Sequence, residues 1–62
     1  MLQCSLSELT QLSEIITAER GIADKYKKCS ADSSDPQLRE LFQRCASIHQ
    51  NHCTLLENLL SS

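Results

Sequence analysis

Two thiols and two imidazoles fall within nine residues in the second half of the chain, as Cys45, His49, His52 and Cys53. An α-helix turns about 100° per residue, so residues three and four apart share a face. On such a helix Cys45, His49 and His52 lie inside the apolar stripe, and Cys53 lies at its edge. The larger apolar residues of that stripe are Leu38, Leu41, Phe42, Leu56 and Leu59. Imidazole and thiolate groups bind zinc, copper and iron, so this segment offers candidate metal ligands. The alternative is that the histidines are core residues hydrogen-bonded to a neighbouring side chain.

The first half of the chain has an apolar stripe of its own, and a carboxylate occupies its centre. Glu19 is flanked, at helical spacing, by Leu9, Leu12, Ile15, Ile16, Ile22, Ala23 and Tyr26. A lone buried charge is costly, so this acid is expected to be paired, protonated or bound to a metal.

Capping signals define two helices. Ser5 and Glu8 fit a capping box, which predicts a first helix over about residues 6–30. The polar segment 31–35 predicts a turn, and Asp35 followed by Pro36 predicts the start of a second helix over about residues 36–60. The fold class is therefore all-α, an antiparallel two-helix hairpin. In this hairpin Glu19 and His49 lie at nearly the same height, and His52 lies one layer further from the turn.

Length and composition limit the possible architectures. The chain has 62 residues, of which 40% are hydrophobic, and this is enough for one small domain covering residues 1–62. Both apolar stripes are wide, so each helix is expected to contact more than one neighbour. A two-fold homodimer forming a four-helix bundle, or another helical partner, would satisfy both stripes. The alternative is a monomeric hairpin of marginal stability.

Charge and hydropathy argue against several partners and locations. A net charge of −2 does not favour nucleic acid as a partner. No apolar run is long enough to span a bilayer, and the N-terminal residues lack the pattern of a secretory signal. We therefore expect no membrane association and a cytoplasmic location.

The spacing of the four cysteines argues against a disulfide-stapled hairpin. A turn near Ser33 pairs residues across the hairpin whose numbers sum to about 67. Cys4 with Cys53 gives 57 and Cys29 with Cys45 gives 74, so no single register joins both pairs. Free thiols in a reducing compartment are the prediction.

Three segments resemble a known family: Ala18–Tyr26, Ser34–Arg39 and Ile48–Gln50. Together they are similar to the spore coat protein F-like family of spore-forming Firmicutes, whose members typically carry "S-[DN]-P-x-L-R" and "EEHQ" motifs. The resemblance covers about residues 14–57. It implies a ferritin-like helical fold, a role in the spore coat and, as matching site residues, Glu19 and His49.

The chain departs from this family's pattern where acidic ligands would stand. The two residues before His49 are Ser47 and Ile48 rather than acids, and Ala46 replaces the glutamate of a Glu-x-x-His motif. The full carboxylate-rich site of a ferritin-like protein is therefore absent. Cys45 and His52 are candidates to take its place.

Two functions follow from these observations. The first is a small, non-enzymatic structural or assembly protein of the spore coat type, located in the cytoplasm or on the spore. The alternative is a metal-binding helical bundle in which Glu19, His49, His52 and Cys45 bind zinc, iron or copper. An enzyme is not expected, because the sequence has no activated nucleophile, phosphate-binding loop or cofactor fingerprint.

Overall fold

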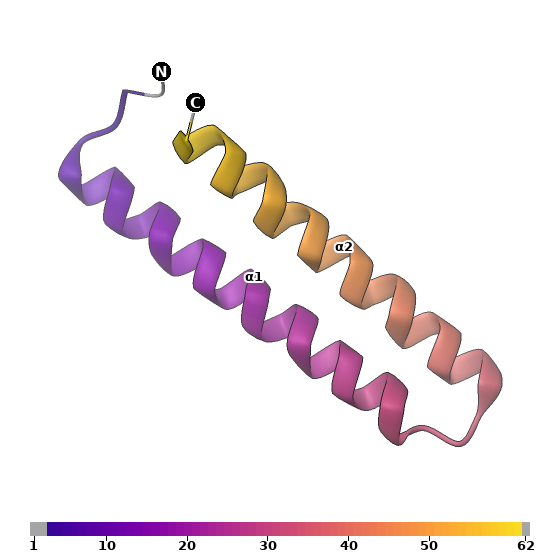
Figure 1. Ribbon diagram of the computed structural model, residues 1–62. Helices are drawn as coiled ribbons and strands as arrows, with labels where there is room; N and C mark the ends of the chain where they lie inside the picture. Colours follow the sequence, from indigo (N-terminus) through magenta and orange to yellow (C-terminus); the bar gives the residue numbers. More distant parts are fainter. Residues whose placement is uncertain (1–2, 62) are drawn as a thin grey trace.

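The computed structural model describes residues 3–61, and Met1, Leu2 and Ser62 of the predicted domain lie outside the described residues. It consists of two antiparallel helices, α1 (Leu6–Asp32) and α2 (Pro36–Ser61), which lie side by side along their length (Figure 1). The hairpin measures 46 × 17 × 10 Å. The predicted hairpin and turn are confirmed, and each helix extends one or two residues beyond its predicted end.

Local hydrogen bonds explain why the helices begin where they do. The Ser5 hydroxyl accepts from the backbone N–H of Glu8, while the Ser5 N–H donates to the Glu8 carboxylate, which is the predicted capping box. Asp35 Oδ1 accepts from the N–H groups of Gln37 and Leu38, at 2.8 and 3.1 Å. Both helix starts are therefore specified within a few residues of sequence.

The turn is held by contacts between the helix ends. The Ser30 hydroxyl donates to the carbonyl oxygen of Arg39, and the Arg39 guanidinium donates to the carbonyl oxygen of Ser33 through two nitrogens. The Ser33 N–H donates to the carbonyls of Cys29 and Ser30, which extends α1 to Asp32.

A seam of residues spaced alternately by three and four joins the helices. On α1 it consists of Leu12, Ile16, Glu19, Ala23, Tyr26 and Ser30, and on α2 of Phe42, Ala46, His49, Cys53 and Leu56. This spacing is the heptad pattern of a coiled coil. Ala23 and Cys53 are fully buried and Ala46 nearly so, because small side chains let the helices approach closely. Two hydrogen-bonded pairs across the hairpin, Ser30–Arg39 and Ile16–Cys53, have residue numbers that sum to 69. This is close to the predicted sum of about 67.

One side of the hairpin carries a second set of apolar residues, which we call the apolar face. Its members are between 41% and 60% exposed and are Ile15, Ile22, Leu38, Leu41, Ile48 and Leu55. Viewed around the axis of each helix, they lie about 40–140° from the seam residues, and the direction of this rotation is the same on both helices. Since the helices are antiparallel, the same sense of rotation leads to the same side of the hairpin.

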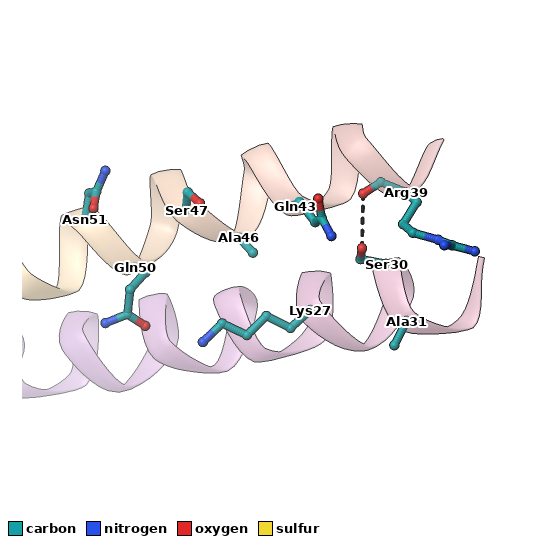
Figure 2. A pocket seen from close by; sticks show the side chains of 9 residues that line it. All are labelled: Lys27, Ser30, Ala31, Arg39, Gln43, Ala46, Ser47, Gln50 and Asn51. Atoms are coloured by element: carbon teal, nitrogen blue, oxygen red, sulfur yellow. Dashed lines mark hydrogen bonds between the residues drawn. The ribbon is translucent and has the colours of Figure 1, made fainter. Parts of the chain in front are cut away.

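The opposite side, the polar face, has different chemistry. Arg20 and Glu57 form an ion pair across the helices there. Further along, an open groove of about 740 Å³ is lined mostly by polar side chains, drawn in Figure 2: Lys27, Ser30, Ala31, Arg39, Gln43, Ala46, Ser47, Gln50 and Asn51. Neither helix of the described part has the hydropathy needed to cross a membrane.

Candidate metal centre

Glu19 and His49 meet at the middle of the hairpin. Glu19 has 13 residues of α1 on each side of it, and His49 lies near the centre of α2. Both belong to the seam, where every other layer is filled by apolar or small side chains or by the Tyr26 ring. The predicted alignment of these two residues at one height is confirmed by direct contact.

The Glu19 carboxylate contacts both imidazoles through one oxygen. Glu19 Oε2 lies 2.6 Å from His49 Nδ1 and 3.3 Å from His52 Nδ1. A ring with its proton on Nδ1 donates to this oxygen. The side chains of Glu19 and His49 are 21% and 25% exposed, whereas that of His52 is 51% exposed. The cluster is therefore closed toward the seam and open on the side of His52.

The opening lies on the apolar face. His52 is seven residues after Cys45 and fourteen after Leu38, so it shares their stripe on α2. From this stripe its ring reaches back to Glu19 and meets the His49 ring edge-on, with 5.6 Å between ring centroids. The sequence pattern predicted His52 inside the apolar stripe. In the structure it lies half-exposed, at the border between the seam and the apolar face.

Tyr26 fixes the orientation of His49. Its ring stacks on the imidazole with 5.6 Å between centroids and 17° between planes, and its other neighbour is Phe42, at 6.2 Å. Stacking of this kind restricts rotation of the imidazole about its own bonds. Sequence reasoning had assigned Tyr26 no part in the site, although its spacing of seven residues from Glu19 puts it on the same face.

Hydrogen bonding keeps the carboxylate ionised. The bond from His49 is the main cause that lowers the pKa of Glu19 below its usual value of 4.5. Partial burial opposes this effect, and His52 adds to it through a second hydrogen bond and its charge. An ionised carboxylate is the form that binds a metal ion.

One atom each of Glu19, His49 and His52 could serve as metal ligands, and these atoms lie within 4.8 Å of one another. Ligands about 2.1 Å from a tetrahedral zinc ion are separated by roughly 3.4 Å. The two contacts with Glu19 are already shorter than this separation. Small side-chain rotations would therefore admit an ion.

Cys45, the fourth candidate ligand, is not a member of this three-residue group. It lies half-buried one turn before His49, and all four cysteines are free. Cys53 was expected at the edge of the stripe but is completely buried in the seam. Its Sγ lies 3.5 Å from the carbonyl oxygen of Ile16 and 3.4 Å from Glu57 Oε1, and its single S–H can donate to either. Burial is the main cause that raises its pKa.

The structure thus brings together three of the four predicted ligands, Glu19, His49 and His52. No known protein family, curated protein or solved structure matches the chain.

Proposed function

We propose that the chain is a non-enzymatic assembly protein, and that two copies pair through their apolar faces into a four-helix bundle. The observation that carries this proposal is the apolar face itself. A single hairpin buries only the seam and leaves the six aliphatic side chains of the apolar face about half exposed. On soluble proteins, exposed apolar patches of this extent are often interaction sites.

The spacing of the apolar face favours a second copy as the partner. Ile22 follows Ile15 by seven residues, and Leu41, Ile48 and Leu55 repeat with the same spacing. A stripe with this period packs best against other helices of the same pitch. The same face on another copy offers such helices.

The size of the apolar face also fits a dimer. From their exposed fractions, its six aliphatic residues present roughly 500 Å² of surface. A stable complex buries about 800 Å² per partner, so the dimer interface would extend from these six residues to the side chains beside them. The resemblance to the spore coat protein F-like family supports an assembly role, and its implied ferritin-like fold and spore location stay predictions.

Solution mass tests the assembly proposal. At concentrations well above micromolar, sedimentation equilibrium should give the mass of two chains. Ile48→Glu, which would place a carboxylate in each half of the interface, should weaken pairing by roughly a hundredfold or more. The matched control is Gln43→Glu on the polar face, which should leave pairing unchanged. A fully helical wild type with the mass of one chain would refute the proposal.

Metal binding is the second candidate function, favoured by the convergence of Glu19, His49 and His52. Two imidazoles and a carboxylate form a donor set suited to zinc, iron or copper and poorly suited to calcium or magnesium. Titration of the protein with zinc should reveal saturable binding, and Glu19→Gln should abolish it. Absence of binding at micromolar zinc would exclude this candidate.

A further inference from the structure

We propose that the metal centre is shared: one divalent ion binds per two chains, between the two apolar faces, and is held by Glu19 and His52 from each copy. This inference rests on both parts of the proposed function. It adds the stoichiometry, the ligand set and a consequence, which is that metal binding and pairing strengthen one another.

The position of the cluster is the first argument. Glu19 is the central residue of α1, and the cluster opens onto the apolar face at the middle of the hairpin. Two copies that pair face to face with full overlap therefore bring both clusters into the same layer, whether the turns lie at the same end or at opposite ends. A cluster near one end would meet its copy in only one of these two arrangements.

The number of ligands is the second argument. A structural zinc site takes four protein ligands, but the described residues of one hairpin bring only three candidates together. Among them His52 has the most exposed side chain, and it borders the face where the second copy docks. Glu19 and His52 from each copy would complete a set of four ligands.

His49 then has a different role. It lies deeper in the seam, packed against Tyr26, and it contacts Glu19 more closely than His52 does. A hydrogen bond of this kind, from a residue that does not itself touch the metal, orients a carboxylate ligand and tunes its basicity. His49 is therefore a positioning residue, and its removal should weaken metal binding without changing the stoichiometry.

Charge balance is the third argument. Two ionised Glu19 carboxylates neutralise one divalent ion, whereas an ion in each hairpin would leave two net positive charges facing each other between apolar surfaces. Uncompensated charge in such an environment is costly. Without metal, the two carboxylates repel each other across the interface, so the metal-free dimer is weaker than the apolar face alone would make it.

Zinc is the probe for the test, and native mass spectrometry together with sedimentation equilibrium gives the readouts. We expect saturation at one zinc per two chains. Since zinc would bind the dimer and not the single chain, zinc at a hundred times its dissociation constant should tighten pairing by roughly a hundredfold. His52→Ala should abolish the binding of one zinc per two chains. His49→Ala should weaken zinc binding by roughly 10–100-fold and keep the ratio of one zinc per two chains.

The controls separate this inference from the proposed function. Gln50→Ala lies on the polar face of the same helix and should preserve both stoichiometry and coupling, and circular dichroism verifies that each variant is helical. One zinc per chain with an unchanged dimer constant would overturn the shared centre while leaving metal binding intact. Binding of one zinc per two chains by the His52→Ala variant would also overturn the shared centre. Absence of zinc binding would instead remove the metal-binding function itself.

Discussion

The two faces of the hairpin have the same backbone geometry and opposite chemistry. On the polar face, Gln43 and Gln50 are seven residues apart on α2. On the apolar face, Leu41 and Ile48 have the same spacing and similar distance from the seam. The heptad period therefore does not by itself predict an interface. The apolar side chains at these positions make one face a docking surface, while amides and charges keep the other solvated.

The faces also differ in how their charged groups are used. Arg20 and Glu57 pair on the polar face with about half of each side chain exposed, so water and salt screen the pair. Glu19 is less exposed and is held by two imidazoles next to aliphatic side chains. The same residue type thus serves solubility on one face and the formation of a specific cluster on the other.

Converting the polar face into an apolar one should have the largest effect. The double variant Gln43→Leu with Gln50→Leu would give α2 a second aliphatic stripe with seven-residue spacing. We expect it to form species larger than the wild-type assembly, because each copy would then present two docking surfaces. Size-exclusion chromatography with light scattering measures this. Gln43→Ala with Gln50→Ala is the control, and an unchanged mass for the leucine variant would show that aliphatic side chains at this spacing do not suffice.

Thiol reactivity should distinguish the seam from the apolar face. Cys45 is half-buried beside the apolar face, whereas Cys53 is sealed in the seam, where burial raises its pKa. Alkylation at pH 8 requires an accessible thiolate, so Cys53 should react at least roughly tenfold more slowly than Cys45. Peptide mapping after timed labelling gives both rates.

Dilution sharpens the thiol test. If a second copy covers the apolar face, dilution below the dimer constant should accelerate the labelling of Cys45, while the labelling of Cys53 should continue to depend on opening of the hairpin. Equal rates for Cys45 and Cys53 in the folded protein would contradict the burial of Cys53.

Acid should destabilise the protein partly through Glu19. Its pKa is lowered in the folded state, so its contribution to stability is present above the unfolded value of 4.5 and is lost as the pH falls through the lower folded value. Urea midpoints measured between about pH 5 and pH 3 should fall for the wild type and change less for Glu19→Gln. A curve for Glu19→Gln as steep as that of the wild type would contradict this assignment.

Glu8 makes a second, independent contribution to folding stability that is lost in acid. The Ser5 backbone N–H is the main cause that lowers its pKa, at the start of α1 and away from the metal cluster. Glu8→Gln should therefore flatten part of the same pH profile. Because the two sites are far apart on α1, the double variant should show the sum of both effects.

Local signals in the sequence were sufficient for the helix boundaries and the register. The capping box at Ser5 and the Asp35-Pro36 pair each act within four residues, so no knowledge of the partner helix is needed. A short turn then determines which residues lie opposite one another, and this brought Glu19 and His49 together as predicted.

The sequence could not separate the seam from the apolar face. On α2 the seam and the apolar face are adjacent stripes. The average direction of all apolar side chains around the helix axis therefore falls between the two stripes, and Cys45 and His52 lie at this average direction. The true seam passes through Ala46 and Cys53, whose small side chains add little apolar weight but permit close helix approach. Side-chain size at the contact, rather than hydrophobicity, decided which residues are buried.

Gly21 should give the smallest effect and test the edge between the two faces. It lies two residues after Glu19, on the side of α1 that points away from α2. A methyl group there would meet no atom within 4 Å apart from its chain neighbours and the nearby backbone of its own helix. Glycine in a helix interior costs about 0.5–1 kcal/mol relative to alanine, because it loses more backbone entropy on folding. Gly21→Ala should therefore raise the free energy of unfolding by about that amount, as measured by urea denaturation at a fixed protein concentration. The dimer constant should stay unchanged, because this edge lies outside the apolar face. If the substitution instead weakened pairing, a second copy would have to approach α1 from its outer edge, and the assignment of the apolar face as the docking surface would be wrong.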